Sequence, residues 1–227
     1  MMSKRYCLVI FCSLVFHSFG AIRVVCTTAL TDKYFEFREK QYKESFSILK
    51  SYGVKDFYIV EALKKQGPTF LEEYASNVFY STVNNASFTN NGANEAATFL
   101  EGLYYFDFDD EDLIIKFTGR HQLTSDYILR LIEKKHDYDA FVNMQDNGGV
   151  STLGFAMKCK HFKKMYEDMQ LNQIGFSSRS IEYFVGDFIL KKSREDGFKV
   201  CYLEKLYMKA NTFGSSTALG ASGIVYY

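Results

Sequence analysis

The fold of this chain is decided by the stretch Ile22-Arg23-Val24-Val25-Cys26-Thr27-Thr28-Ala29-Leu30. It is continuous in apolar and β-branched residues, which is typical of a strand buried on both faces in a parallel sheet. Apolar residues then repeat at helical spacing, namely Tyr42, Phe46 and Leu49. This pattern ends at Gly53, and residues 54–61 read as a second strand. The order predicts a βαβ unit with parallel strands and a right-handed crossover.

Strands and helices continue to alternate along the chain. Further strands are predicted at residues 77–83, 113–117, 138–144, 152–157 and 198–203. Further helices are predicted at residues 93–104, from 125 or 126 to 132, at 159–169 and at 181–189. The alternation predicts a three-layer α/β domain with a mostly parallel sheet over residues 21–208. Residues 209–227 are rich in Gly, Ser, Thr and Ala and are expected to form a loosely ordered tail.

The composition fits a single domain with a sizeable core. The chain has 227 residues, of which 47% are hydrophobic and 17% aromatic, and this excludes a disordered or collagen-like chain. Lys and Arg number 27 and Asp and Glu also number 27. We therefore expect no nucleic-acid partner, because the chain has no net field to hold one.

Residues 1–20 read as a signal peptide or short hydrophobic leader. Lys4 and Arg5 precede an apolar run from residue 7 to 16, and small residues follow. The run is short for a membrane span, which needs about 20 apolar residues. The leader predicts export or entry into a secretory pathway, with membrane contact only if it is retained. The alternative is a cytoplasmic protein whose first element is a buried strand.

The cysteines do not form a metal-binding pattern. Two lie in the leader, and the other three, Cys26, Cys159 and Cys201, stand among apolar residues without zinc-like spacing. Buried thiols are the preferred interpretation, and one disulfide remains open if the chain leaves the cytosol.

The most informative polar stretch stands at the end of the predicted strand 113–117. There Lys116, Thr118, Gly119, Arg120 and His121 follow apolar residues within six positions. Ligands of open α/β sheets bind beyond the carboxyl ends of the strands. Arg and Lys beside a glycine suit a phosphate or diphosphate, because the glycine lets the backbone approach. The alternative is a solvated strand end with His121 packed against a neighbouring ring.

A second polar group precedes the helix at residues 93–104. Asn91, Gly92, Asn94 and Glu95 crowd its first turn, where free amides favour anions and where Asx side chains also serve as caps. Glu61, at the end of the second strand, is a candidate acceptor for a ribose or base.

Together these residues resemble a group of GT-A-fold glycosyltransferase-like proteins. The match consists of Asn91-Gly92-Ala93-Asn94-Glu95-Ala96 and, some twenty residues later, Ile114-Ile115-Lys116-Phe117-Thr118-Gly119-Arg120-His121. Arg38, Tyr42 and Glu61 fit the same pattern, whereas His121 replaces the usual Tyr. The resemblance spans residues 22–189.

The resemblance implies a glycosyltransferase that moves a sugar from a nucleotide-diphosphosugar donor to a glycan or other hydroxyl acceptor. Lys116 and Arg120 would hold the diphosphate with Thr118, Gly119 and His121 beside them. The group at residues 91–95 would shape the donor site. Glu182 is the candidate base, with Asp146 as the other candidate; Glu182 also fits an ordinary first-turn acid.

The resemblance also raises the question of a metal. Many GT-A enzymes hold Mn²⁺ or Mg²⁺ with an Asp-x-Asp, and this chain has Asp107-Phe108-Asp109. Those residues equally read as part of an acidic turn before the strand at 113–117. Fixed cations at Lys116 and Arg120 would neutralise the diphosphate without a metal. A different interpretation of the whole chain is a secreted, non-catalytic binding protein that retains the fold.

Overall fold

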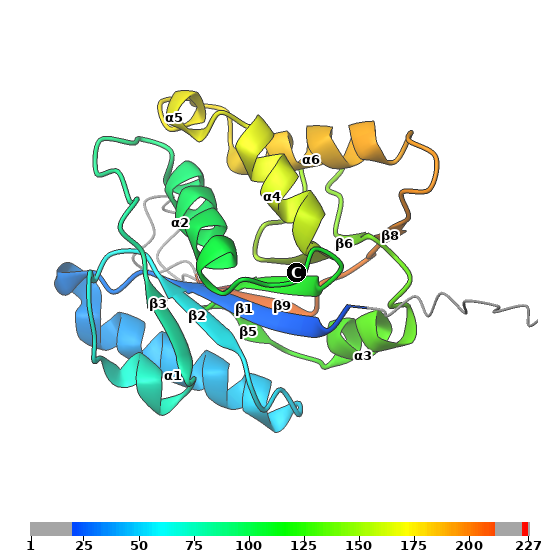
Figure 1. The fold of residues 1–227 in the computed structure, drawn as a ribbon. Helices are drawn as coiled ribbons and strands as arrows, with labels where there is room; N and C mark the ends of the chain where they lie inside the picture. Colours follow the sequence, from blue (N-terminus) through cyan, green and yellow to red (C-terminus); the bar gives the residue numbers. More distant parts are fainter. Residues whose placement is uncertain (1–19, 212–223, 227) are drawn as a thin grey trace, which may run out of the picture.

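The computed structural model describes residues 20–211 and 224–226, and its centre is a seven-stranded sheet (Figure 1). In spatial order the strands are β3 (Asn77–Tyr80), β2 (Tyr58–Glu61), β1 (Ile22–Thr28), β4 (Leu113–Thr118), β7 (Gly154–Lys158), β6 (Ala140–Val142) and β8 (Val200–Tyr202). All neighbours are parallel except β7, which is antiparallel to β4 and to β6. The predicted, mostly parallel sheet is thus confirmed.

Helices cover both faces of the sheet. Helices α1 (Phe35–Ser51) and α3 (Tyr127–Lys134) lie on one face, and α2 (Asn91–Tyr105), α4 (Cys159–Asp168) and α6 (Ile181–Lys192) lie on the other (Figure 1). Short helical turns η1 (Asp32–Tyr34), η2 (Phe70–Glu73) and α5 (Leu171–Ile174) occupy the connections. Each face has its own apolar core, which confirms the three-layer architecture.

The alternation along the two central strands explains these two cores. In β4, Ile115 and Phe117 join the core beneath α1, whereas Ile114 joins the core beneath α2. Side chains alternate between the faces of a strand, so Lys116 and Thr118 face the same side as Ile114. In the neighbouring β1, Thr27 stands in register with Thr118. The α2 side therefore receives all three polar side chains.

A second, antiparallel sheet differs from the expectation for the end of the chain. Strands β10 (Ile224–Tyr226), β9 (Met208–Asn211) and β5 (Gln122–Leu123) pair in that order. A loosely ordered tail is predicted for residues 209–227, yet residues 209–211 and 224–226 are strands. These strands are stabilised by pairing across a long sequence separation, and three- or four-residue strands have no readable periodicity. Residues 212–223 lie outside the described part of the chain.

The leader, residues 1–19, also lies outside the described residues. Within the part of the chain that is described, no helix is long and apolar enough to cross a membrane. Cys26, Cys159 and Cys201 are buried free thiols, which confirms the preferred interpretation of these three residues.

The direction of the chain connections changes at the carboxyl ends of β1 and β4. From β1 the chain proceeds outward to β2 and β3 on one side, whereas β4 lies on the other side of β1. Such a reversal of direction opens the sheet edge to ligands in α/β proteins. The candidate site residues at the end of β4 and the start of α2 meet at this edge.

Candidate functional site

Lys116 is the centre of a buried polar network. Its side chain is only 3% exposed, and its ammonium nitrogen lies 2.6 Å from Glu95 Oε1, 3.1 Å from Thr118 Oγ1 and 2.8 Å from the carbonyl oxygen of Thr152. An ammonium group has three hydrogens to donate, and these three acceptors match them.

One oxygen of Glu95 accepts hydrogen bonds from three side chains of two strands. Besides Lys116, its Oε1 accepts from Thr27 Oγ1 at 2.5 Å and from Thr118 Oγ1 at 2.8 Å. Burial alone would raise the pKa of Glu95, but the charge of Lys116 and these hydrogen bonds outweigh it and lower the pKa to about 2. Glu95 is therefore a firmly ionised carboxylate that joins α2 to β1 and β4.

This network changes the role predicted for Lys116 and Thr118. A cation that holds a diphosphate must offer free N–H groups to it, whereas Lys116 spends its donors on protein acceptors. The prediction that Lys116 holds the diphosphate is therefore corrected: strand alternation turns its side chain beneath α2, where Glu95 meets it. Lys116 and Thr118 are buried and support this edge from within, whereas the side chain of Glu95 is 30% exposed.

Glu182 lies at the far end of the same network. Thr152 Oγ1 donates to Glu182 Oε1 at 2.7 Å, while the carbonyl of Thr152 accepts from Lys116. Ser180 also donates to the carboxylate of Glu182. The carboxylates of Glu95 and Glu182, together with burial, raise the pKa of the Tyr166 phenol. The two acids thus share one electrostatic environment, with Glu182 half-buried at the start of α6.

Asp146 lies in the loop that joins β6 to β7 and is exposed. This loop packs against the start of α6, since the backbone N–H of Val150 donates to the carbonyl oxygen of Glu182 at 2.9 Å. Asp146 is consequently at the carboxyl edge of the sheet, on the outer side of the loop.

Glu61 is fully buried and organises the backbone around the end of β2. Its Oε1 accepts from the backbone N–H groups of Leu30 at 3.0 Å, Leu63 at 2.8 Å and Lys64 at 3.0 Å. Its Oε2 accepts from Thr28 Oγ1 at 2.6 Å. The predicted role as acceptor for a ribose or base is therefore corrected, because the carboxylate is buried and bonded to the turns that follow β1 and β2.

The Asn-rich start of α2 is mainly a cap. Asn90 is the N-cap, and its side chain accepts from the N–H groups of Gly92 and Ala93. Asn94 uses both ends of its amide on the backbone of Asn85, at 2.8 and 2.9 Å. The donor role predicted for Asn94 therefore becomes a loop-holding role.

Of the two other predicted residues at this helix start, Asn91 faces solvent and Gly92 packs against α6. Asn91 is exposed at the first position of α2. A Cβ on Gly92 would lie 2.4 Å from Ile181 Cγ2, so this glycine allows the starts of α2 and α6 to pack together.

Gly119 and His121 also pack within the protein. A Cβ on Gly119 would lie 3.0 Å from the carbonyl oxygen of Thr27, so the missing side chain lets β4 leave the sheet close to β1. His121 is 3% exposed, and burial and the Arg120 charge lower its pKa well below the usual value. Its backbone carbonyl accepts from Ser45 Oγ at 2.6 Å. His121 is therefore a neutral, buried ring.

Two arginines, Arg38 and Arg120, lie at this edge and influence each other electrostatically. Arg38, in the first turns of α1, is 5% exposed, and burial and the charge of Arg120 lower its pKa. Tyr42, one helical turn later, feels both cations, and its hydroxyl accepts from the backbone N–H of Ala29 at 2.8 Å. Arg120 is half-buried at the end of β4. Two guanidinium groups that repel each other in this way are stabilised by an anion beside them.

Asp107 and Asp109 lie at the opposite edge of the sheet. They follow the carboxyl end of α2, where Phe106 and Phe108 pack on Tyr58, the first residue of β2. Helix α2 runs antiparallel to the strands, so its carboxyl end cannot share an edge with Arg120. This position separates the pair from the proposed diphosphate region. In the described residues no group of three or more His, Cys, Asp or Glu side chains could hold a metal.

The acids near Lys116 do not fit a divalent cation either. Glu95 directs its bonded oxygen to an ammonium and two hydroxyl groups, and a metal at the same oxygen would face the charge of Lys116. No step of the chemistry is therefore assigned to Mn²⁺ or Mg²⁺.

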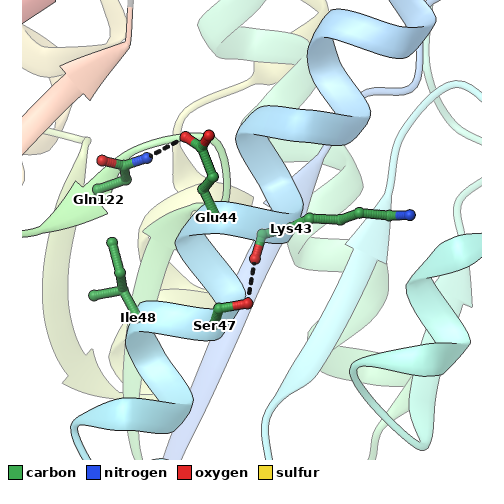
Figure 2. Close-up of a pocket in the computed structure, with 5 residues that line it drawn as sticks. All are labelled: Lys43, Glu44, Ser47, Ile48 and Gln122. Atoms are coloured by element: carbon green, nitrogen blue, oxygen red, sulfur yellow. Dashed lines mark hydrogen bonds between the residues drawn. The ribbon is translucent and has the colours of Figure 1, made fainter.

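A surface cavity of about 480 Å³ lies elsewhere, between α1 and β5. Figure 2 shows its lining residues, Lys43, Glu44, Ser47, Ile48 and Gln122. The carboxamide of Gln122 donates to Glu44 Oε2 at 2.9 Å across this cavity. None of the predicted site residues lines it.

Sequence reasoning missed Thr27 and Thr152. Thr27 is a polar residue near the end of a mostly apolar strand, and this position indicates a need for a polar partner. Thr152 was placed inside a predicted strand, whereas β7 begins at Gly154 and leaves Thr152 in the preceding loop. Its contacts with Lys116 and Glu182 depend on tertiary packing, which has no local signature.

No protein-family model and no curated protein sequence matches the chain. Among solved structures it is similar to a cytidylyltransferase from Leptospira borgpetersenii, with 11% identity and a TM-score of 0.51, over 82% of this chain and 78% of the other. A glycosyltransferase involved in glycosylation of the major capsid of PBCV-1 gives 7% identity and a TM-score of 0.48, over 81% and 83%. The galactosyltransferase LgtC, in complex with donor and acceptor sugar analogs, gives 13% and 0.46, over 78% and 72%.

Identities this low concern the fold alone, and of these three similarities only the first has a TM-score above 0.5. The chain therefore has a mixed α/β, GT-A-like fold with a mostly parallel seven-stranded sheet, similar to that of the cytidylyltransferase.

Proposed function

We propose that this protein is a glycosyltransferase that binds a nucleotide-diphosphosugar donor at the carboxyl edge of β1 and β4 and transfers the sugar to a glycan or other hydroxyl acceptor. The observation that carries the proposal is the placement of two arginines at this edge: Arg38 is buried in the first turn of α1, and Arg120 is half-buried at the end of β4, near enough for its charge to lower the pKa of Arg38. Two cations held together are stabilised by a bound anion of high charge, such as a diphosphate.

Arg120 is the principal diphosphate ligand in this proposal. It is half-buried at the end of β4, so its guanidinium can reach a ligand, whereas Lys116 is committed to Glu95. A guanidinium binds two phosphate oxygens at once through its planar fork. Positive charge at this position also stabilises the negative charge that develops on the leaving nucleoside diphosphate.

Arg38 lies beneath Arg120 as a second source of positive charge. Burial lowers the solvent screening of its charge, which strengthens its attraction for a phosphate. The hydroxyl of Tyr42 accepts a hydrogen bond from the backbone N–H of Ala29 and so holds in place the turn after β1, which would contact the donor.

Glu182 is the proposed base for the acceptor hydroxyl, with Asp146 as the other candidate. Glu182 is half-buried, and Thr152 links it to Lys116, whose strand β4 ends next to Arg120. A base must come within hydrogen-bond reach of the hydroxyl whose proton it accepts. Replacing Glu182 by Gln is expected to lower turnover at least a hundredfold with donor affinity unchanged, and Asp146→Asn serves as the parallel test.

The proposal is tested by calorimetric titration of the protein with UDP, CDP, GDP and ADP and with their sugar conjugates. Arg120→Ala should weaken binding of the preferred nucleotide at least tenfold, because one charge-assisted bidentate contact is lost. The melting temperature should change little, since Arg120 lies partly exposed. Arg194→Ala, an exposed arginine beyond α6, is the matched control.

Turnover is then measured with the preferred nucleotide sugar and a panel of glycan acceptors. Release of nucleoside diphosphate together with a longer glycan supports the proposal. Pyrophosphate release from a nucleoside triphosphate and a sugar phosphate would instead indicate a nucleotidyltransferase. Binding without either reaction would indicate a binding protein, and absence of binding across the whole panel would refute the donor site.

A further inference from the structure

Gln41, on α1, carries a buried amide group that the surrounding protein does not satisfy. The residue is 2% exposed, and within the described part of the chain neither its Oε1 nor its Nε2 has a hydrogen-bond partner. Buried side-chain amides are nearly always bonded at both ends, because an unmet donor and an unmet acceptor each destabilise the fold. A leucine or methionine at this position would remove that cost.

The helix places this amide beside the proposed donor site. Residues three or four apart share a face of a helix, and Arg38, Gln41 and Ser45 follow this spacing on the buried side of α1. Arg38 lies within electrostatic reach of Arg120, and Ser45 donates to the carbonyl oxygen of His121. Gln41, between them, therefore faces the same Arg120–His121 segment after β4.

The direction of the side chain supports this placement. Helical side chains lean toward the amino end of their helix. Helix α1 begins after β1, so its amino end is at the carboxyl edge of the sheet, where Tyr42 reaches the N–H of Ala29. The amide of Gln41 therefore leans toward that edge. Thr31, in the turn before α1, adds a second buried oxygen without a partner among the described residues.

We infer that Gln41 is a specificity-determining residue that hydrogen-bonds the nucleoside part of the donor, next to the diphosphate held by Arg38 and Arg120. This inference rests on the proposed function. A carboxamide offers one acceptor and two donors side by side, which complements a nucleobase edge or the hydroxyl pair of a ribose. It has no charge, so it contributes little to the recognition of a phosphate. A ligand that satisfies the amide recovers the stability that the free protein forgoes.

The test separates the nucleoside from the diphosphate. Gln41→Met keeps the length of the side chain and removes its donors and acceptor, and Gln41→Leu is measured beside it as a second apolar variant. Calorimetric titration is performed with the tightest-binding nucleoside diphosphate of UDP, CDP, GDP and ADP and, separately, with inorganic pyrophosphate. We expect affinity for the nucleoside diphosphate to fall at least tenfold and affinity for pyrophosphate to stay within twofold.

The same variants report on the free protein. Because an unsatisfied amide is removed, at least one of the two variants should melt at the wild-type temperature or above it. Gln173→Met, at an exposed glutamine within α5, should change neither property. Arg120→Ala should weaken both ligands, in contrast to the Gln41 variants.

The possible failures are distinguishable. Unchanged nucleoside diphosphate affinity in both Gln41 variants would overturn the inference and leave the proposed function intact. Equal loss for pyrophosphate would also overturn it, since the residue would then serve the anion. If the wild-type protein binds pyrophosphate as tightly as it binds the best nucleoside diphosphate, then the protein does not recognise the nucleoside, and the inference is overturned. If it binds neither ligand, the proposed function fails first and this inference with it.

Discussion

The ammonium nitrogen of Lys116 lies 2.6 Å from Glu95 Oε1, and that same oxygen also accepts hydrogen bonds from Thr27 and Thr118. One carboxylate oxygen therefore links strand β1, strand β4 and helix α2 directly beneath the carboxyl edge of the sheet. The Lys116 side chain is 3% exposed and that of Glu95 30% exposed, so the ammonium is enclosed while part of the Glu95 side chain reaches the surface. Substitutions in this network are therefore expected to change the stability of the fold more than the affinity for a ligand.

Lys116→Met is expected to destabilise the fold while leaving nucleotide affinity nearly unchanged. The substitution leaves the Glu95 carboxylate beneath α2 without its cation, and removal of one partner of a buried ion pair costs about 3 kcal/mol of unfolding free energy. Urea unfolding followed by circular dichroism measures this loss. Lys191→Met, at an exposed position of α6, is the control. A variant of normal stability with at least tenfold weaker nucleotide binding would restore Lys116 as a diphosphate ligand.

The stability of the protein should fall in acid because of Glu95. Its pKa is lowered to about 2 in the folded protein, so the carboxylate stabilises the fold at pH values above the unfolded pKa of about 4.3. This stabilisation, roughly 2–3 kcal/mol, is lost as the pH falls from about 5 toward 2. The free energy of unfolding is measured over this range for the wild type and Glu95→Gln. Parallel curves for the two proteins would contradict the assignment.

Glu61→Gln is expected to loosen the turns after β1 and β2. The carboxylate accepts three backbone amides and one hydroxyl, and an amide side chain cannot accept all four with equal strength. We expect a loss of about 2 kcal/mol of unfolding free energy and faster hydrogen exchange at the N–H groups of Leu63 and Lys64. Glu133→Gln, exposed on α3, should change neither quantity. Normal protection in the Glu61 variant would show that the turns hold without the charge.

Gly119→Ala distinguishes packing from ligand approach. The added Cβ would lie 3.0 Å from the carbonyl oxygen of Thr27 and 3.3 Å from Phe46 Cε1 and Thr28 Cγ2, so the variant should lose about 1–2 kcal/mol of unfolding free energy. Nucleotide affinity should change less than threefold in the folded variant. The opposite result, normal stability with greatly weakened binding, would show that the glycine serves the ligand.

Much of the fold could be predicted because its signals are local. Continuous apolar runs marked β1 and β4, and the spacing of Tyr42, Phe46 and Leu49 marked α1. The short strands β9 and β10 could not be predicted in the same way, since their pairing with β5 is the main reason that they are strands.

The sequence predicted that the polar residues of the candidate site lie together, but not which of them bond to one another. Polar residues at the ends of β1, β2 and β4 and at the start of α2 do meet, because parallel strands end at one edge. Whether Lys116 faces a ligand or the protein depends on which side of the strand it occupies. Its alternation with Ile114 in a buried strand could have shown that it needs an internal partner. The partner itself, Glu95, belongs to a helix whose rotation about its axis the sequence does not specify.

Strand β7 runs in the opposite direction to its neighbours β4 and β6. At the carboxyl edge of the parallel strands, the chain leaves each of those strands but enters β7. The residues that β7 brings to this edge therefore lie in the loop before it, which carries Thr152. That loop joins two antiparallel neighbours, so its length can change without altering the register of β1, β2 and β4. Insertions or deletions between β6 and β7 would remodel the wall around Glu182 while the donor side stayed as it was. If the proposed function holds, changes in this loop would alter the choice of acceptor and leave the proposed nucleotide side in place.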